Sequence, residues 1–444
     1  MSLPRYSNYK YSGTDWLGEV PAQWRIVPMW TLFRRTKRTG YADEQLLSVY
    51  RDHGVVPKAS RDDNNNKPSD DLSVYQLVEP GDLAINKMKA WQGSVAISEH
   101  RGIVSPAYFV YEAVHSESSR FLHYLLRSPR YITGYLANSK GIRVNQWDLE
   151  PQYHSRMPVV LPSEAEQATI AVFLDRETAK IDALIAQQER LISLLSEKRQ
   201  ATISHAVTRG LNLNAPMKDT GVQWLGEVPA HWERVQLGRL CTQVSDGPHF
   251  SPSYVDEGVM FLSARNIRVD GWSLEDAKYV SEADYKEFCG RVVPEVGDIL
   301  YTKGGTTGVA RVVDLEERFQ VWVHVAVLKL RRDIALPHYV AYALNSLGCY
   351  EQSQLFTRGA TNQDLGLTRM VRIFLALPPM AEQAEVVRFL NSETAKLDAL
   401  KAESERVIEL LRERRSALIT AAVTGQIDVR SGLATATEPE ELAA

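Results

Sequence analysis

The chain has 444 residues, 44% of them hydrophobic, and a formal net charge of -4 at pH 7. This length predicts two to four domains, each able to bury its own core. The net charge would argue against a nucleic-acid partner if it were evenly spread, and it is not. Residues 25–160 hold 18 Lys and Arg against 14 Asp and Glu, whereas residues 233–376 hold 16 against 18.

The cysteines and the apolar runs indicate the cellular compartment. Cys241, Cys289 and Cys349 lie far apart, which favours neither a disulfide framework nor a metal site. Residues 1–10 lack the apolar core of a signal peptide, and the most apolar run, 321–328, has only the length of a strand. We therefore expect a cytoplasmic protein that is neither secreted nor inserted in a membrane.

Two segments of the chain occur twice. Residues 16–24 return as 224–232 with eight of nine positions identical, and residues 165–208 return as 381–424 with 26 of 44 identical. The stretches between them, 30–160 and 240–376, differ in nearly everything but length. Such self-similarity at a long period predicts a duplicated protein in which two similar frames carry two different domains.

The variable stretches have the pattern of short strands separated by turn residues. The predicted strands are 80–86, 94–98 and 107–111 in the first stretch, and 296–302, 308–313 and 321–330 in the second. Helices are predicted at 121–127 and 337–347. Because the order is the same in both stretches, we expect one shared fold with different surfaces.

The repeated segments predict two long helices, each of about 45 residues, or roughly 65 Å at ~1.5 Å per residue. Apolar residues recur at coiled-coil spacing in the same phase of both. The predicted seam consists of Ile181, Leu184, Leu191, Leu195, Leu397, Leu400, Val407 and Leu411. The two helices are expected to pack on each other as an antiparallel pair; the alternatives are that each folds back on its own domain or pairs with another chain.

The motifs of several common enzyme classes are missing from the sequence. There is no phosphate-binding loop, His-Glu-x-x-His, Cys-x-x-Cys or Gly-x-Ser-x-Gly motif. The Pro-Pro motif of amino-methyltransferases is also incomplete in residues 377–380, which lack the preceding amide and the aromatic ring. We therefore expect no catalysis by this chain alone, and we name no catalytic or metal-binding residue.

Loops that follow the predicted strands carry residues suited to DNA. Lys and glycine suit a phosphate, Arg suits guanine, and Asn or Gln suits adenine. The candidate DNA-binding residues of the first half are Lys87, Lys89, Trp91, Gln92, Lys140, Arg143, Asn145 and Gln146. Those of the second half are Asp246, His249, Arg265, Asn266, Lys303, Thr306, Arg358, Asn362 and Gln363. The alternative for each group is a solvated hairpin loop, a turn or a helix cap.

The doubled motifs resemble the specificity subunit of Type I restriction-modification enzymes. They are Trp-Leu-Gly-Glu-Val-Pro-x-x-Trp, Leu-Pro-x-x-x-Glu-Gln, Glu-Thr-Ala-Lys-x-Asp-Ala-Leu and Ala-Val-Thr, each present twice. The resemblance implies two target-recognition domains, each reading half of a split asymmetric site in double-stranded DNA. It also implies docking of two methyltransferase subunits and of motor-nuclease subunits. S-adenosylmethionine, ATP and Mg²⁺ would then belong to those partners, with no cofactor in this chain.

The expected fold is α+β, with two α/β-type recognition domains separated by two long helices in an antiparallel coiled coil, and an internal pseudo-two-fold repeat. The expected boundaries are 1–160 and 211–376 for the recognition domains, 161–210 and 377–427 for the helices, and 428–444 for a disordered tail. Two other functions remain open: a coiled-coil scaffold that binds only proteins, and a recognition subunit of a related defence system.

Overall fold

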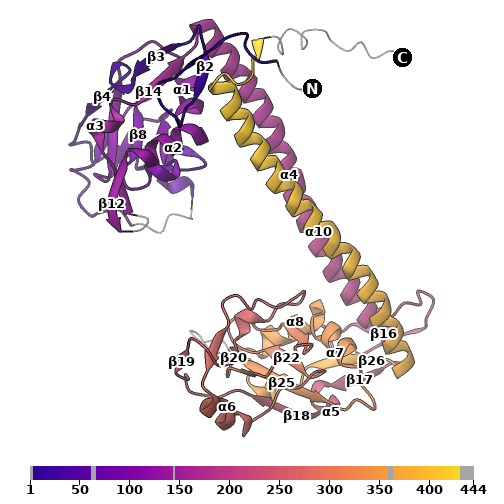
Figure 1. Ribbon diagram of the computed structural model, residues 1–444. Helices are drawn as coiled ribbons and strands as arrows, with labels where there is room; N and C mark the ends of the chain where they lie inside the picture. Colours follow the sequence, from indigo (N-terminus) through magenta and orange to yellow (C-terminus); the bar gives the residue numbers. More distant parts are fainter. Residues whose placement is uncertain (1–3, 62–66, 144–145, 359–363, 431–444) are drawn as a thin grey trace, which may run out of the picture. The chain divides into compact units, whose positions relative to one another are not determined.

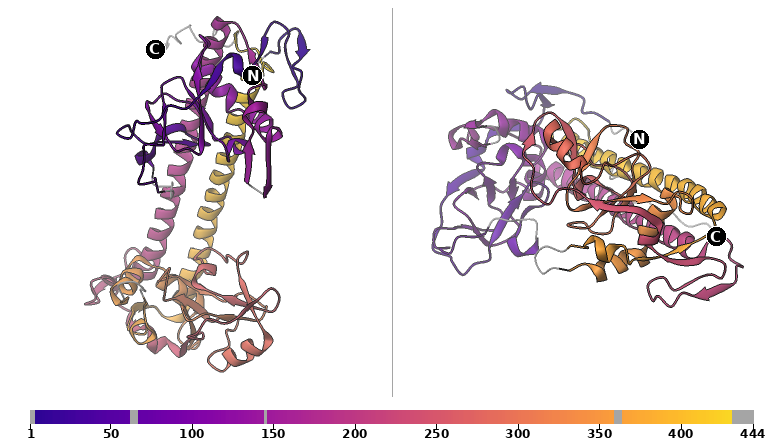
Figure 2. Two further views of the ribbon diagram at one scale, coloured as in Figure 1. Left: turned by 90° about the vertical axis from the view of Figure 1, so that its left-hand side faces the viewer. Right: turned by 90° about the horizontal axis from the view of Figure 1, so that it is seen from below.

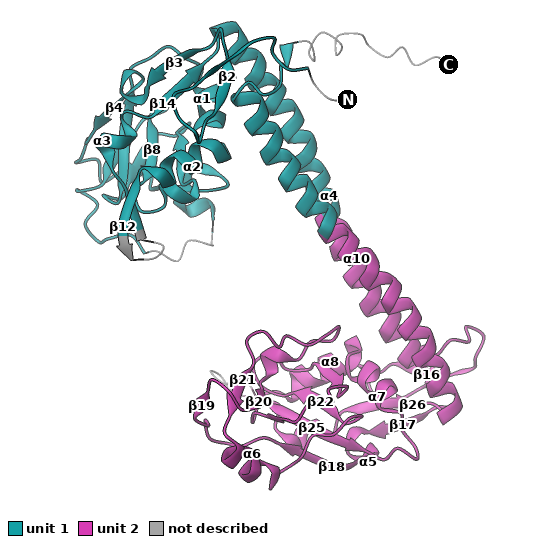
Figure 3. Cartoon of the chain, in the orientation of Figure 1, with its two compact units in different colours: residues 1–188, 406–444 teal, residues 189–405 magenta. Residues whose placement is uncertain are grey.

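The computed structural model describes residues 4–61, 67–143, 146–358 and 364–430 (Figure 1). The chain forms two compact units (Figure 3). Unit 1 comprises the first 188 residues together with the chain from Arg406 onward, and unit 2 comprises Glu189–Glu405. Each unit therefore contains one globular part and a portion of both long helices, so unit 1 is not a continuous piece of sequence.

The globular part of unit 1 is built on a four-stranded antiparallel sheet in the order β4-β11-β8-β9. Two short helices, α1 and α2, follow the last strand of this sheet. Its strands are β1 Tyr9–Tyr11, β2 Glu19–Pro21, β3 Arg25–Pro28, β4 Phe33–Thr36, β5 Leu47–Tyr50, β6 Gly54–Pro57, β7 Gln76–Val78, β8 Leu83–Asn86, β9 Val95–Ile97, β10 Gly102–Val104, β11 Tyr108–Ala113, β12 Ser139–Arg143, β13 Gln146–Leu149 and β14 Pro158–Leu161. Its helices are α1 Ser119–Leu126, α2 Pro129–Ala137 and α3 Pro151–His154.

Unit 2 repeats this frame with the sheet β18-β25-β22-β23, and adds a second sheet in the order β19-β21-β20-β24. Its strands are β15 Met217–Asp219, β16 Glu227–Pro229, β17 Glu233–Gln236, β18 Cys241–Asp246, β19 Tyr254–Val255, β20 Val259–Leu262, β21 Lys278–Val280, β22 Ile299–Thr302, β23 Ala310–Val312, β24 Phe319–Val321, β25 Val325–Leu330 and β26 Phe374–Leu377. Its short helices are α5 Leu237–Leu240, α6 Glu282–Cys289, α7 Pro337–Leu344, α8 Leu347–Phe356 and α9 Leu367–Met370.

The mixed α/β fold with two long helices agrees with the sequence prediction. The strand predicted at 321–330 includes all of β25 and only the last residue of β24, and these two strands belong to different sheets. Between them Val325 N donates to Trp322 O at 2.9 Å, which closes a tight turn inside an apolar run. Hydrophobicity alone did not reveal that turn, because it contains no Gly or Pro.

The long helices are α4, Glu164–Arg209, and α10, Met380–Val423. Figures 1 and 2 show them side by side. In unit 1 Arg415 Nε lies 2.9 Å from Asp182 Oδ1, and in unit 2 Arg199 Nε lies 3.2 Å from Asp398 Oδ1. In unit 1 the core joins Ile170 of α4 to Val423 of α10, so α10 runs back from Val423 to Arg415 as α4 advances from Ile170 to Asp182. In unit 2 the core joins Ile203 of α4 to Val386 of α10, so α10 runs back from Asp398 to Val386 as α4 advances from Arg199 to Ile203. The helix pair within each unit is therefore antiparallel.

Each of these ion pairs is the repeat of the other. Asp398 and Arg415 stand in the second long repeat where Asp182 and Arg199 stand in the first. The duplication thus reproduces its own contacts between helices, with an aspartate of one copy facing an arginine of the other.

The predicted seam needs correction at three positions. Ile181, Leu195 and Leu397 are buried, and Val407 and Leu411 are half-buried. Leu184, Leu191 and Leu400 are instead exposed, Leu184 by 45% and Leu400 by 55%. The buried face of α4 advances by alternate steps of four and three residues through Ile181, Ile185, Gln188, Ile192 and Leu195. The prediction took a step of three residues, from Ile181 to Leu184, where the buried face takes a step of four, to Ile185. Leu184 was therefore assigned to the seam although it is exposed to solvent.

The ends of the long helices complete the cores of the globular parts. In unit 1 Ile170 and Leu174 of α4 and Val423 of α10 belong to the main hydrophobic cluster. In unit 2 Ile203 of α4 and Val386 of α10 take the same role. Because these buried side chains are shared by helix and sheet, each globular part and its helix ends form one cooperative core.

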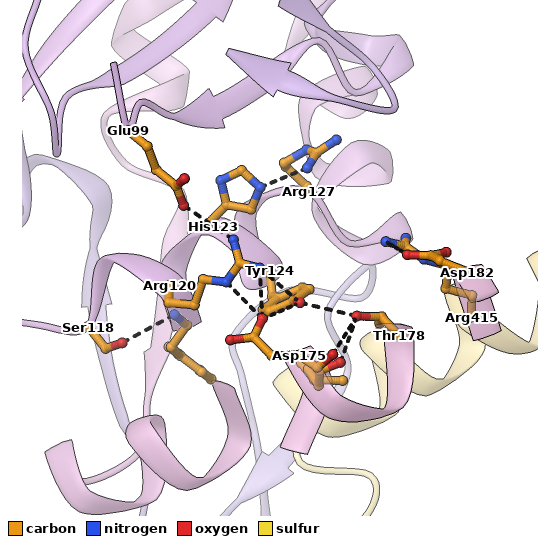
Figure 4. Close-up of polar contacts among 12 residues, drawn as sticks. Glu99, Ser118, Arg120, His123, Tyr124, Arg127, Asp175, Thr178, Asp182 and Arg415 are labelled. Carbon is orange, nitrogen blue, oxygen red and sulfur yellow. Dashed lines mark hydrogen bonds and ion pairs between the residues drawn. The ribbon is translucent and has the colours of Figure 1, made fainter. Parts of the chain in front are cut away.

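Polar contacts add to this attachment in unit 1 (Figure 4). Arg120 Nε and Tyr124 Oη of α1 both bond Asp175 Oδ1 of α4, at 2.8 and 2.7 Å. The equivalent contact in unit 2 is neutral, because Tyr342 Oη donates to Asn391 Oδ1 at 2.8 Å. A charged network thus ties the first globular part to α4, whereas an amide ties the second to α10.

The residues that follow α10 pack against the N-terminal segment of the chain. Asp428 N donates to Pro4 O at 2.7 Å, and Tyr9 Oη donates to Gly425 O at 2.9 Å. The disordered tail expected from residue 428 therefore does not begin there, because residues 428–430 pack against the N-terminal segment. The rest of that tail, 431–444, lies outside the described residues.

Candidate nucleic-acid interface

The Asp246–His249 turn of unit 2 is organised by a buried carboxylate. Asp246 closes β18, and its side chain is only 3% exposed. Arg291 Nη2 lies 2.7 Å from Asp246 Oδ1, and His249 Nε2 lies 3.2 Å from the same oxygen. Burial tends to raise the pKa of Asp246, but the hydrogen bonds from Arg291 and His249 and the charge of Lys303 hold it below its ordinary value. Asp246 is thus an internal anchor, while His249 is exposed.

Lys303, expected to contact phosphate, is buried in the same cluster. Its side chain is 5% exposed, and Nζ lies 3.0 Å from Asp364 Oδ1 and 3.4 Å from Asp246 Oδ2. Two carboxylates already neutralise this cation, and it has little surface to offer to DNA. A phosphate contact by Lys303 is therefore not supported by its position.

Two glycines allow these segments to approach so closely. A Cβ on Gly247 would lie 1.8 Å from Val321 O, and a Cβ on Gly304 would lie 2.2 Å from His324 Nδ1. Since real Cβ atoms essentially never approach other atoms within 3.0 Å, a larger residue at position 247 would displace the Val321 backbone, and one at position 304 would displace the His324 ring. Both glycines flank residues of the Asp246–Lys303 cluster and so help to define its shape.

The next loop of unit 2 carries two candidates for base recognition, of which Arg265 is exposed and Asn266 is buried. Asn266 is buried: its Oδ1 accepts from Ser263 N at 2.8 Å, and its Nδ2 donates to Ser273 O at 2.8 Å. Its amide is thus used within the loop, which is the cap-like role left open by the sequence. Arg265 is exposed, and among the described residues no carboxylate forms an ion pair with it. Thr306 is exposed beside it, with its hydroxyl 3.4 Å from Ala264 O.

A cavity of about 530 Å³ lies beside this loop within unit 2. Arg265, Arg268 and Thr306 line one side, and Arg199 of α4 and Lys401 of α10 line the other. Arg199 and Lys401 pair with the two carboxylates of the lining, Asp398 and Asp270, at 3.2 and 3.9 Å. Arg265 and Arg268 therefore give the lining its excess of positive charge.

The remaining candidates of unit 2 lie in the segment between α8 and α9. Arg358 is exposed, and its backbone pairs with that of Asp364 in both directions, at 3.1 and 3.0 Å. This pairing brings Arg358 and Asp364 side by side. Asn362 and Gln363 come between them in the sequence and lie outside the described residues.

In unit 1 the candidates following β8 are more open. Lys89 and Gln92 are exposed, and Lys87 and Trp91 are half-buried. Trp91 Nε1 donates to Met88 O at 3.0 Å, and its ring meets that of Trp147 edge to face, with centroids 4.8 Å apart.

The β12–β13 hairpin of unit 1 carries the other candidates of that half. Lys140 is exposed, 3.8 Å from Glu150 and 4.8 Å above the Tyr153 ring. The structure places Arg143 at the end of β12 and Gln146 at the start of β13, while Asn145 lies outside the described residues. The hairpin thus pairs the backbone of Arg143 with that of Gln146, two of the positions that the sequence had grouped.

Three participants were not identified from the sequence. Trp147 joins Trp91, Arg291 holds Asp246, and Arg268 lines the cavity beside Arg265. A tryptophan directly after Asn-Gln was a usable signal for Trp147. Nothing local marks Arg291, because its partner is 45 residues away.

The described residues contain no group of His, Cys, Asp and Glu placed to hold a metal ion. None of the helices within these described ranges is long and apolar enough to span a membrane. Apart from these absences, the similar frames of the two units each carry an exposed basic side chain close to the end of a strand, Lys89 in unit 1 and Arg265 in unit 2.

Comparison with known proteins agrees with this layout. A family model described as the Type I restriction modification DNA specificity domain matches residues 229–410. The EcoKI specificity subunit of Escherichia coli (strain K12) is 21% identical over 449 residues, covering 92% of this chain and 90% of that protein. The StySPI specificity subunit of Salmonella potsdam is 20% identical with the same coverage of both chains.

A solved structure concerned with complex assembly and conformational transition of the type I restriction-modification system has the same fold. It superposes with a TM-score of 0.63 at 19% identity, over 92% of this chain and 99% of that one. The chain is thus similar over nearly its whole length to specificity subunits of Type I restriction-modification enzymes, and its second half matches their specificity-domain model. The relatives are specificity subunits, and the expectation that this chain is a non-catalytic recognition subunit agrees with that similarity.

Proposed function

We propose that this chain recognises a bipartite, asymmetric site in double-stranded DNA, with one recognition domain for each half-site. We assign residues 1–160 and 211–376 to the two domains, and 161–210 and 377–427 to helical spacers. The observation that carries this proposal is that one frame is built twice with different loops: a second four-stranded sheet is present in unit 2, and shorter pairs of strands occupy unit 1. Two unlike readers on like frames fit two unlike half-sites.

The test is to exchange residues 30–160 for the first domain of another family member and to map methylated adenines in cells that also carry the methyltransferase subunit. One half of the methylated site should change and the other should remain. A simultaneous change of both halves would contradict independent readers. Normal assembly without any DNA binding, at low salt and with the methyltransferase present, would favour a protein-only scaffold.

We further propose that the helices dock two methyltransferase subunits. Leu184 and Leu410 are exposed in unit 1, and Leu194 and Leu400 are exposed in unit 2. The second pair repeats the first, because Leu184 and Leu194 of the first long repeat correspond to Leu400 and Leu410 of the second. Exposed leucines on a helix favour a protein partner, and a duplicated pair favours two copies of the same partner.

Native mass spectrometry of the complex can count these copies. Combining Leu184→Glu with Leu410→Glu should remove one methyltransferase subunit, and the same changes at Leu194 and Leu400 should remove one as well. Ala186→Glu is the matched control, because Ala186 is exposed but lies about 200° around the helix from Leu184. Loss of neither subunit in both leucine variants would place the docking surface elsewhere.

The cofactors and location follow from this assignment. S-adenosylmethionine would be used by the methyltransferase subunits, and ATP and Mg²⁺ by the motor-nuclease subunits, so the chain itself would carry none. Since its substrate is cellular or incoming DNA, the complex would work in the cytoplasm. Purified alone, the chain should neither methylate nor cut DNA, and adding the methyltransferase should restore adenine methylation.

A further inference from the structure

The two units place a lysine at the same point of their shared frame. Lys87 and Lys303 each come directly after a strand of the main sheet, β8 or β22. Leu365 N donates to Lys303 O at 2.8 Å, and Leu149 N donates to Lys87 O at 3.0 Å. The backbone around the two lysines is therefore equivalent.

The surroundings of these lysines differ in charge. In unit 2 Ser245 pairs with Val327, which pairs with Leu300, and Asp246 follows Ser245. In unit 1 Thr36 pairs with Val110, which pairs with Ala84, and Lys37 follows Thr36. Ala84 and Leu300 are equivalent, because each is the second residue of its strand and stands three positions before the lysine. The register thus places Lys37 where unit 2 has Asp246, so the anionic anchor of one unit is replaced by a cation in the other.

Asp364, the second carboxylate beside Lys303, also has an equivalent in unit 1, but among the residues that the structure describes that equivalent forms no ion pair with Lys87. Asp148 directly precedes Leu149 as Asp364 precedes Leu365, yet Asp148 is exposed and forms no ion pair within the described part of the chain. Lys37 is also exposed, Lys87 is half-buried, and neither has a carboxylate within 4 Å among the described residues. In unit 2 the corresponding lysine lies between two carboxylates.

We propose that the two equivalent lysines have different roles: Lys87 contacts the DNA backbone, whereas Lys303 positions the loops of unit 2 and makes no phosphate contact. Lys303 joins three segments that are distant in sequence, namely the Asp246–His249 turn, its own loop and the segment beginning at Asp364. This inference rests on the proposed function, because it divides the work of DNA binding between the units. It also agrees with the charge of the two stretches, because Lys and Arg outnumber Asp and Glu in residues 25–160, whereas Asp and Glu outnumber Lys and Arg in 233–376.

The test uses the complex of this chain with its methyltransferase, and compares Lys87→Met with Lys303→Met. Binding to a specific and a random duplex is measured by fluorescence anisotropy over a range of salt concentrations. Each phosphate contact adds about 0.9 to the slope of log K against log salt. Lys87→Met should lower that slope by about 0.9 on both duplexes. Lys303→Met should leave the slope unchanged, weaken only specific binding, and relax only the half-site read by unit 2.

Asp364→Asn is a milder variant. For this variant a phosphate contact by Lys303 and a positioning role of Lys303 predict opposite changes in DNA affinity. If Lys303 were a phosphate contact, removal of a competing carboxylate would free it and strengthen binding to both duplexes. If Lys303 positions loops, the same change should weaken specific binding about tenfold and leave random-duplex binding as it was. Asp148→Asn at the equivalent position of unit 1 should change specific binding by less than about twofold.

Hydrogen exchange of the β22 and β25 peptides is the control that tests whether unit 2 remains folded in each variant. An equal loss of slope in Lys87→Met and Lys303→Met, or tighter binding by Asp364→Asn, would overturn the inference while leaving the proposed function intact. If the unmodified complex bound neither duplex, the proposed function itself would fail.

Discussion

A buried histidine makes unit 1 sensitive to mild acid. His154, the last residue of α3, is fully buried, with its ring centroid 5.0 Å from that of Tyr111 and 6.0 Å from that of Tyr135. Neither ring nitrogen has a hydrogen-bond partner among the described residues. Burial lowers the pKa of His154 from 6.5 to about 4, because the charged imidazolium would lose its hydration.

The direction of the pH effect follows from this depressed pKa. Between pH 6.5 and 4 the unfolded chain binds a proton at His154 that the folded chain does not, so stability is complete above 6.5 and falls as the pH is lowered. At pH 5 the expected loss from this residue is about 2 kcal/mol, or roughly 30-fold in the unfolding constant. His154→Phe should remove this loss. At pH 7 it should also stabilise unit 1 by about 1 kcal/mol, because two unpaired nitrogens leave the core.

Hydrogen exchange mass spectrometry at pH 7 and pH 5 measures the opening free energy of β8 and β11 peptides in the full chain. The acid-induced loss should be about 2 kcal/mol smaller in His154→Phe than in the unmodified protein. Other histidines of unit 1 contribute equally to both proteins and cancel in this difference. His53→Phe, at an exposed position of the same unit, is the control and should behave like the unmodified protein. An equal acid loss in His154→Phe and the unmodified chain would refute the reasoning.

Two further predictions concern the unit-2 turn and the helix pair. Gly247→Ala should destabilise unit 2 by about 1–3 kcal/mol, because its Cβ would meet a backbone oxygen at 1.8 Å, whereas Gly271→Ala, with open space around it, should be neutral in the same denaturant titration. Inserting four residues after Ala183 and four after Ala399 lengthens both helices by roughly 6 Å with a net turn of only about 40°. The complex should then methylate sites whose gap is one or two base pairs longer, with the same bases. An insertion after Ala183 alone should impair assembly, because one helix would lose register with the other; an unchanged gap in an active doubly inserted complex would show that the helices do not set the spacing.

The sequence alone determined the duplication, the long helices and the main strands. A constant offset between repeated segments and an apolar repeat over many helical turns are properties of the chain itself, and they are local enough to read directly. The sequence did not show which of two adjacent apolar residues is buried. Leu184 and Ile185 are equally apolar, and only packing against α10 buries the isoleucine more than the leucine.

Side-chain roles at the interface were decided by tertiary structure. The sequence correctly grouped Lys303 with the glycines that follow it, but it could not show that Asp364, 61 residues later, lies 3.0 Å from its Nζ. The same applies to Asn266, whose amide is used by its own loop, while its neighbour Arg265 remains exposed. Residue type decides what a side chain can bind, whereas its partners in the fold decide whether it is free to do so. Lys87 and Lys303 share type and backbone position, and they differ only because the folded chain surrounds them with different charges.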